Sequence, residues 1–375
     1  MRLQLTFCLM LAVAFLCVAQ SARADESSGT WTGTLEGRGN YFWENSTRVV
    51  VPEAELNIEA PNGVRAGVGY LIDAISSASI AQTGSDVDQV FTEYRHGIHA
   101  NVGKEFDLGP LQIDPSAHAT YSTEDDYTSW IYGLGTDFSF DQRTNKVSLG
   151  VTLVNDSIKA NNQADFDGEL NGITSSLGYE RVLLPTLVLT VSYQLGYLQG
   201  FLGNPYRRVV FSEGAPIREA PPGSRTRHNA SAKLSWFIPP SRTALQLSYR
   251  GYIDSWDIGA ITPELRVLQE LGDDLIVRVH YRFYAQTAAS FVRSDRSPYP
   301  GSSGAPMGPS SNDPKLAELT THTFGGGLEY RLSFLSGSFL DFASAASIDL
   351  SVDRYLTNSS FGNGVMATAG GRLPF

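Results

Sequence analysis

The last twelve residues of the chain alternate between two kinds of side chain, and this pattern restricts the fold more than any other segment does. One set is mainly small and apolar: Val365, Ala367, Ala369, Gly371 and Leu373. The residues between them are Met366, Thr368, Gly370 and Arg372, and the chain stops on Phe375. A period of two places alternate residues on opposite faces of a β-strand. The chain therefore ends in a strand with two unlike faces.

The same period recurs along the whole chain, in about sixteen segments, within a range of 14 to 18. They are 30–44, 53–60, 64–74, 93–106, 111–124, 127–140, 146–158, 166–181, 186–200, 225–237, 243–256, 258–271, 275–288, 320–332, 339–355 and 362–375. Most are long enough to cross a bilayer as tilted strands. The pattern predicts an all-β fold, namely one transmembrane barrel of antiparallel strands.

The connections between these segments alternate between short and long, as in membrane barrels with short periplasmic turns and long outer loops. The expected short turns are 61–63, 107–110, 141–145, 182–185, 238–242, 272–274 and 333–338. The three longest connections, 75–92, 201–224 and 289–319, all fall on the other side. Because residues 297–314 are rich in Pro, Gly and Ser, we expect a mobile outer loop there.

The N-terminal segment has the features of a secretory signal peptide. Arg2 precedes an apolar run, and Ala22-Arg23-Ala24 is a small-residue cleavage pattern. We therefore predict a signal peptide over 1–24 and a barrel over 25–375. Both cysteines lie in the removed segment, so the mature chain has no thiol. It keeps 26 Lys and Arg against 39 Asp and Glu, a net charge of −13, which argues against nucleic-acid binding.

The closing strand and its terminal aromatic residue resemble those of bacterial outer-membrane barrels. That resemblance implies a location in the bacterial outer membrane, contact with its lipid, and recognition of Phe375 by the barrel-assembly machinery. The 41 aromatic residues, 17 Tyr, 19 Phe and 5 Trp, fit the aromatic girdles of such barrels.

Bilayer hydrocarbon accepts only the apolar face of each strand, so the facing of each residue follows from the sequence. For example, Val277, Val279 and Tyr281 are expected to face lipid, which turns the residues between them inward. The expected lumen-facing set of four neighbouring strands includes Arg225, Arg227, Arg250, Arg266, Arg278, His280 and Arg282. This wall predicts a porin-like passage or docking barrel that favours small anions. The alternative is that the arginines pair with acids on facing walls, such as Asp137, Glu169, Glu329 or Asp349, and brace or plug the barrel.

Nothing in the sequence indicates an enzyme or a metal site. His96 and His99 are an odd number of residues apart on one strand, so they face opposite sides. His280 lies between two same-face arginines, which disfavours a bound cation. A lone histidine here is more often a hydrogen-bonding group than a ligand or a base. The acidic run 124–126 is expected to be solvated at a loop tip.

Several stretches resemble a family of bacterial outer-membrane proteins known as domain of unknown function 3570. They are Asp73-Ala74-Ile75-Ser76-Ser77-Ala78-Ser79, Gly203-Asn204-Pro205-Tyr206-Arg207, Tyr249-Arg250-Gly251-Tyr252-Ile253-Asp254-Ser255-Trp256 and Tyr281-Arg282-Phe283-Tyr284-Ala285-Gln286-Thr287-Ala288. The resemblance implies the barrel fold and leaves the activity open.

The first of these stretches also resembles the acceptor sequence of periplasmic flavin transferases. That resemblance implies covalent FMN on Ser79, and with it an alternative function as a flavinylated or partner-docking component of an extracytoplasmic electron-transfer system with unknown redox partners. Ser77 and Ser79 depart from the acceptor pattern, which has Gly and Thr at those places. The alternative explanation is that Asp73 and Ser76 organise a turn by hydrogen-bonding nearby amides, with no cofactor at all.

Overall fold

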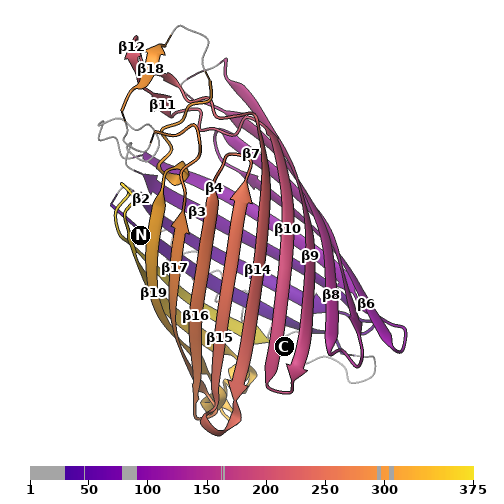
Figure 1. Cartoon of the computed structure of the whole chain (residues 1–375). Helices are drawn as coiled ribbons and strands as arrows, with labels where there is room; N and C mark the ends of the chain where they lie inside the picture. The colour runs from indigo at the N-terminus through magenta and orange to yellow at the C-terminus, as the bar shows by residue number, and fades with distance from the viewer. Residues whose placement is uncertain are drawn as a thin grey trace.

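The chain forms a closed antiparallel barrel of sixteen strands (Figure 1). The computed structural model describes residues 30–45, 47–77, 91–161, 163, 165–293, 297–303 and 308–375. The barrel strands are β1 (Thr32–Trp43), β2 (Thr47–Glu59), β3 (Val64–Ser77), β4 (Phe91–Lys104) with the short β5 (Phe106–Asp107), β6 (Leu111–Thr123), β7 (Tyr127–Phe140), β8 (Asn145–Lys159), β9 (Asp167–Leu184), β10 (Leu187–Gly200), β14 (Ser224–Ile238), β15 (Thr243–Asp254), β16 (Gly259–Leu271), β17 (Leu275–Gln286), β19 (Leu319–Arg331), β20 (Ser347–Thr357) and β21 (Gly364–Pro374). Each of the sixteen overlaps one of the segments expected from the sequence.

The first and last strands close the barrel. β1 pairs with β2 on one side and with β21 on the other, and the backbones of Gly33 and Phe375 exchange two hydrogen bonds of 2.8 and 2.9 Å. Pro374 lies one residue before this bonded pair, so its nitrogen points away from β1 and toward β20. Ser347, the first residue of β20, pairs with Arg372, so β20 does not reach Pro374. The missing N–H of the proline therefore removes no ladder bond.

Two strand limits differ from those expected. β2 begins at Thr47 instead of residue 53, because pairing with β1 continues past Pro52 while pairing with β3 is interrupted there. β20 begins at Ser347 instead of residue 339. The preceding segment forms the short 3-10 helices η3 (Ser333–Leu335) and η4 (Asp341–Ala343), so this connection is longer than the six residues expected.

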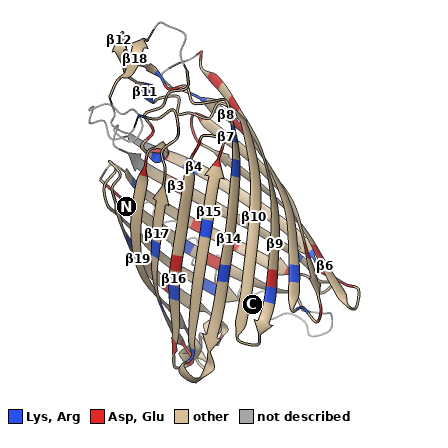
Figure 2. Cartoon of the chain, viewed as in Figure 1, with Lys and Arg blue, Asp and Glu red and all other residues tan. Residues whose placement is uncertain are grey.

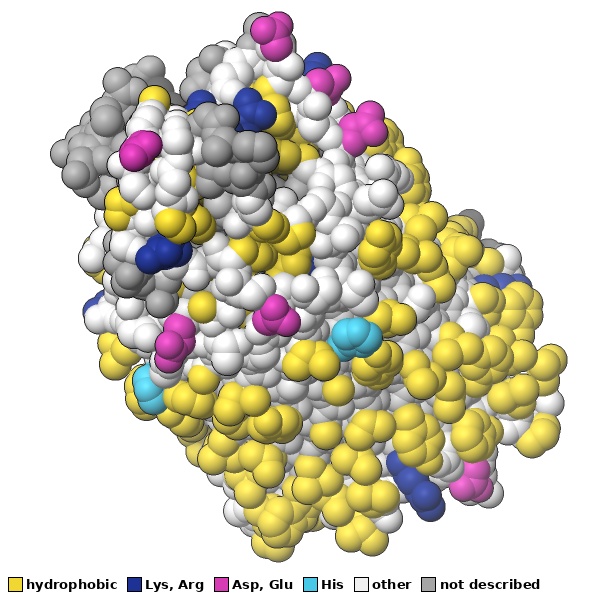
Figure 3. All heavy atoms as spheres, turned by 45° about the horizontal axis from the view of Figure 1, so that its top comes forward, with side chains coloured by type: hydrophobic (Ala, Val, Ile, Leu, Met, Phe, Trp, Pro, Cys, Tyr) yellow, Lys and Arg dark blue, Asp and Glu magenta, His cyan; other side chains and the backbone are white. Residues whose placement is uncertain are grey.

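The outer surface of the barrel is apolar, as Figure 3 shows for one face. Its residues alternate along the strands with those that face the lumen. Exposed members include Val68, Ile98, Val102, Trp130, Leu134, Leu149, Val151, Leu177, Leu247, Leu265, Val279, Leu328, Leu350 and Val352. They lie on most strands around the barrel, so the apolar face forms a belt. A belt of this kind is stable only in contact with lipid, and the chain is a transmembrane barrel.

No helix among the described residues is long and apolar enough to span a membrane.

Two outer loops pack against each other in a cap above one side of the barrel (Figure 1). Loop 201–223 contributes β11 (Arg208–Val209), β12 (Phe211–Glu213) and β13 (Ile217–Arg218), and loop 287–318 contributes β18 (Tyr299–Ser302) and the 3-10 helix η2 (Pro314–Leu316). β12 pairs with β18, which joins the two loops. Tyr299, Ser310 and Ser311 are buried in this cap. The prediction of a mobile outer loop over 297–314 is therefore wrong for the described residues.

Candidate functional site

Strands β14 to β17 form a continuous part of the barrel wall, and Figure 2 shows that basic residues recur along them. The exposed apolar residues Leu247, Leu265 and Val279 fix the outer parity of β15, β16 and β17. The opposite parity carries seven cations, Arg225, Arg227, Lys233, Arg250, Arg266, Arg278 and Arg282, and three carboxylates, Asp254, Glu264 and Glu270. We call this surface the cationic wall. All seven residues predicted to line the lumen, His280 included, lie on it.

Near the outer end of the cationic wall, Arg225 is fixed by Asp254. The Nε atom of Arg225 donates to Oδ2 of Asp254 at 2.9 Å, and the guanidinium lies 4.2 Å from the ring centroid of Trp256. The side chain of Asp254 is fully buried and also accepts the hydroxyl of Tyr252 and the backbone amides of Trp256 and Ile258. This network explains why Tyr252, Asp254 and Trp256 occur together in one stretch of sequence. Arg225 is therefore a structural residue and contributes little free charge to the lumen.

Lower on the same wall, Glu264 bridges two arginines. Its Oε1 atom accepts from Nη2 of Arg266 at 2.8 Å, and its Oε2 atom accepts from Nε of Arg282 at 2.7 Å. The side chains of both arginines are still about two fifths exposed to the lumen. One carboxylate offsets one of the two cations, so the trio keeps a net positive charge.

Four cations of the wall have no ion pair among the described residues: Arg227, Lys233, Arg250 and Arg278. Lys233 and Arg250 are exposed to the lumen, whereas Arg227 is partly buried with its Nε atom unpartnered. In the alternative interpretation, the arginines pair with acids on facing walls. The acids that pair with them in the structure are different ones. Asp254 and Glu264 belong to the cationic wall itself, and Glu169 has the outward parity of the exposed Ile173.

His280 meets an acidic side chain in the lumen. Its Nε2 atom lies 3.6 Å from Oδ1 of Asp353, across Gly325 of the strand between them. A Cβ atom at Gly325 would lie 1.9 Å from Asp353 and 2.1 Å from His280, so only glycine permits this approach. The part of the chain that the structure describes contains no group of three or more metal-ligating residues.

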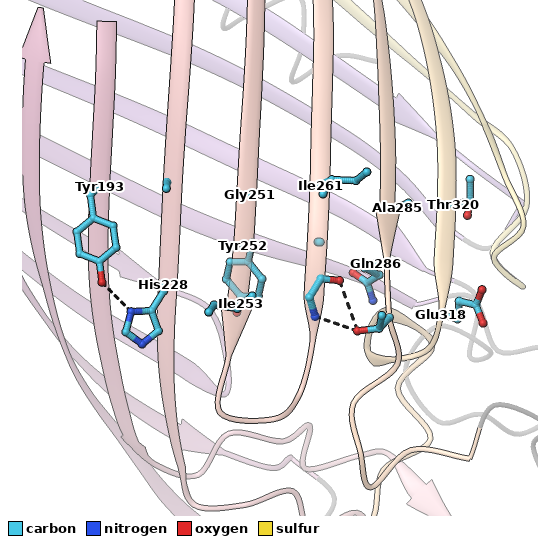
Figure 4. A pocket seen from close by; sticks show the side chains of 14 residues that line it. Tyr193, His228, Gly251, Tyr252, Ile253, Ile261, Ala285, Gln286, Glu318 and Thr320 are labelled. Atoms are coloured by element: carbon cyan, nitrogen blue, oxygen red, sulfur yellow. Dashed lines mark hydrogen bonds between the residues drawn. The ribbon is translucent and has the colours of Figure 1, made fainter.

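Three other histidines point toward lipid, and each contacts a tyrosine on the neighbouring strand. The Nδ1 atoms of His96, His228 and His322 lie 2.7, 2.7 and 2.8 Å from the hydroxyls of Tyr70, Tyr193 and Tyr281, respectively. One pair borders a pocket near the outer ends of β14 to β17 (Figure 4). Its walls include Ala230, Gly251 and Ala285. Among its polar lining residues, Tyr193 and His228 are hydrogen-bonded to each other. These histidines act as hydrogen-bonding groups of the outer surface.

An acidic pocket lies under the outer loop, between the β6–β7 and β8–β9 connections. Glu93, Glu124 and Asp126 line it together with Tyr206 of loop 201–223. The hydroxyl of Tyr206 donates to Asp126. Burial, followed by the charge of Glu93, raises the pKa of Glu124 to about 7. The expectation of a fully solvated loop tip is therefore wrong for Glu124 and Asp126.

Of the three residues named for flavin attachment and its alternative, Asp73, Ser76 and Ser79, only Asp73 is described with its side chain. Ser79, the expected acceptor, lies outside the described residues. Asp73 is buried in the wall of the barrel, where its Oδ2 atom accepts from Nη2 of Arg95 on β4 at 2.8 Å. Asp73 therefore lies in a strand and pairs across it, and does not organise a turn.

The sequence also gave no sign of a buried ionic cluster that holds the cap. Nη1 of Arg207 lies 3.0 Å from both Glu219 Oε1 and Asp313 Oδ2. Ser311 donates to Oε2 of Glu219 at 2.5 Å, and the backbone amide of Asn204 donates to Oε1 at 2.7 Å. The stretch from Gly203 to Arg207 thus has a structural role, because it joins the two outer loops.

The family model described as "Protein of unknown function (DUF3570)" matches residues 74–171 and 162–367, which is most of the chain. No curated protein matches this chain.

Solved structures that match the chain include a ferric enterobactin receptor, OprD and a hydrocarbon channel. The ferric enterobactin receptor PfeA of Pseudomonas aeruginosa is 12% identical over 89% of this chain and 54% of its own, with a TM-score of 0.45, so the chain spans about half of that receptor. OprD of Pseudomonas aeruginosa is 11% identical over 94% and 97%, with a TM-score of 0.43. The CymD monoaromatic hydrocarbon channel is 13% identical over 95% and 91%, also with a TM-score of 0.43.

Proposed function

This chain belongs to the family described as protein of unknown function (DUF3570), and we propose that it is a porin-like passage barrel of the bacterial outer membrane whose cationic wall favours small anions. The observation that carries the proposal is a closed ring of sixteen strands with an apolar outside and a charged inside. Barrels of this strand number leave an aqueous channel between their walls. A solute in that channel meets the exposed guanidinium and ammonium groups of β14 to β17.

The cations without an ion pair determine how strongly the wall attracts anions. Lys233, Arg250 and Arg278 have no carboxylate partner among the described residues, so their charge acts on the solution in the lumen. Arginine and lysine rings give anion preference to other pores by the same physics. Because water screens these charges, the effect is moderate and decreases as salt concentration rises.

Conductance of the refolded chain from residue 25 in a planar bilayer tests this function. A salt gradient gives the ratio of chloride to potassium permeability from the reversal potential. We expect steady channels, and we expect Arg250→Gln with Arg278→Gln to lower that ratio by roughly a factor of two.

The matched control is Arg143→Gln. Arg143 lies in a short connection outside the lumen and pairs with Glu105. It removes the same kind of charge and should leave the ratio unchanged. A correctly folded barrel that never conducts would contradict the passage function, and an unchanged ratio in the double variant would contradict the role of the wall.

A further inference from the structure

The wall across the lumen from the cationic wall carries the opposite charge. In the ring of sixteen strands, β2, β3, β4 and β6 each lie eight places from β14, β15, β16 and β17, respectively. Eight places is half of the circumference. These four strands therefore face the cationic wall.

The inward side chains of these strands are mainly acidic. The exposed residues Val68, Tyr70, Ile98 and Val102 fix the outer parity of β3 and β4, and register extends it to β2 and β6. The inward parity carries six carboxylates, Glu53, Glu55, Glu59, Asp73, Glu93 and Asp114, and two cations, Arg65 and Arg95. We call this surface the acidic wall. Its excess of four negative charges matches the excess of four positive charges on the cationic wall.

Pairing within the acidic wall leaves the carboxylates of β2 without an arginine or lysine partner among the described residues. Arg95 binds Asp73 and Arg65 binds Asp114, so both cations are occupied. Of the carboxylates of β2, Glu55 only accepts from Asn57 and lies 3.9 Å from His99. Glu53 forms no ion pair among the described residues.

A cation on the neighbouring strand does not cancel this charge. Arg38 of β1 lies opposite Glu53 in register but is not within ion-pair distance of it among the described contacts. Glu36, also on β1, lies opposite Glu55 and pairs with Arg372. The segment around Glu53 and Glu55 therefore stays negative.

The charged groups of the two walls lie at similar depth. Counted from the ends joined by short connections, Glu55 and Glu53 are the fifth and seventh residues of β2. By the same count Arg278 is the fourth residue of β17, Lys233 the sixth of β14 and Arg250 the eighth of β15. Cations and carboxylates thus face each other at mid-height.

We infer that this arrangement creates an electric field across the lumen and that the preferred solutes are small zwitterions, which carry a carboxylate and an ammonium group. The inference rests on the proposed passage function, and it places zwitterions ahead of simple anions because a zwitterion gains from both walls and an anion from only one. A zwitterion that turns its carboxylate toward β14 to β17 and its ammonium toward β2 gains from both walls. A simple anion gains from the cationic wall but is repelled by the acidic one. A neutral solute gains from neither.

Two isomers separate the effect of charge from that of size. β-Alanine is a zwitterion, and lactamide has the same composition but no charge. We expect isotonic swelling of liposomes that contain the refolded barrel to be about threefold faster in β-alanine than in lactamide. Liposomes without protein correct for passive entry of each solute.

The decisive variant keeps the net charge and removes the separation. It combines Arg250→Gln and Arg278→Gln with Glu53→Gln and Glu55→Gln, and it should lower the ratio of the two swelling rates to about one. The matched control, Arg65→Gln with Asp114→Asn, removes a cation and a carboxylate that neutralise each other within one wall. This control should keep the preference for β-alanine.

The outcomes distinguish the inference from the function on which it rests. Equal entry of both isomers through the unmodified barrel, or a preference that survives the fourfold substitution, would overturn the inference and leave the passage function intact. A folded barrel that admits neither isomer would contradict both.

Discussion

Asp254 stabilises more of the cationic wall than its single charge suggests. It is fully buried and accepts hydrogen bonds from Arg225, from Tyr252 and from two backbone amides. Asp254→Ala would leave the cation of Arg225 buried without its partner, at a cost of about 3 kcal/mol. We expect a lower temperature for the loss of the folded, fast-migrating band in unboiled gel electrophoresis.

The neighbouring Asp257 provides the control. It is exposed in the same connection and has a positive φ of 66°, which asparagine tolerates. Asp257→Asn should keep the unfolding temperature of the unmodified barrel. Equal stability of the Asp254 and Asp257 variants would show that the buried network does not hold this end of the wall.

Glu124 should keep its proton up to about pH 7. Burial, with the charges of Glu93 and Asp126, raises its pKa from 4.5 to about 7 against the opposing effect of Arg95. The folded state therefore holds the proton more tightly than the unfolded chain, and the contribution of Glu124 to stability falls as pH rises from 4.5 to about 7.

Infrared difference spectra can follow this proton directly. The carbonyl band of a protonated carboxyl group should persist at pH 6 and disappear above pH 7 in the unmodified barrel, since the pKa is raised to about 7. In Glu124→Gln this component should be missing at every pH. A spectrum at pH 6 that is identical in both proteins would mean that Glu124 titrates as an ordinary surface carboxyl.

Among the structural elements, the cap has the cluster around Glu219 as one of its links between the two loops. Arg207→Ala would leave Glu219 and Asp313 without their cation, and a broken buried pair of this kind costs about 3–5 kcal/mol. We expect proteinase K to cleave loops 201–223 and 287–318 faster in this variant while the barrel strands stay protected. Arg208→Ala, which removes an adjacent arginine outside this ion cluster, should keep the cleavage rate low, and equal rates in the two variants would argue against the cluster.

The strands could be predicted from the sequence and the cap could not, for a common physical reason. A strand that separates lipid from water shows its period of two in any ten residues, so all sixteen segments were visible. The start of β2 was predicted too late, because the apolar run Val49 to Val51 shows no alternation and Pro52 is typical of a strand end. The cap depends on contacts such as Ser311 with Glu219, 92 residues apart, for which no local pattern exists.

At the level of the whole molecule, the sequence predicted which side chains face the lumen but not how they share their charges. Bilayer hydrocarbon fixed the inward parity of Arg266, Arg278 and Arg282. Whether an arginine reaches a carboxylate depends on register and side-chain conformation, so the bridging role of Glu264 required the structure. Glu53, Glu55 and Glu59 alternate along β2, but the position of this acidic face opposite β14 depends on closure of the ring.

The three tyrosine–histidine contacts on the outer surface mark a single level of the barrel. Tyr70, Tyr193 and Tyr281 are each the seventh residue of a strand that starts at a short connection. On the adjoining strand, each histidine lies two residues nearer the outer rim than the residue opposite its tyrosine. Strands β3, β10 and β17 are spread around the circumference. Three amphipathic contacts at equal height resist tilting and vertical displacement, since moving any one of them deeper would bring polar groups into hydrocarbon. These contacts therefore fix the depth and the orientation of the barrel in the membrane.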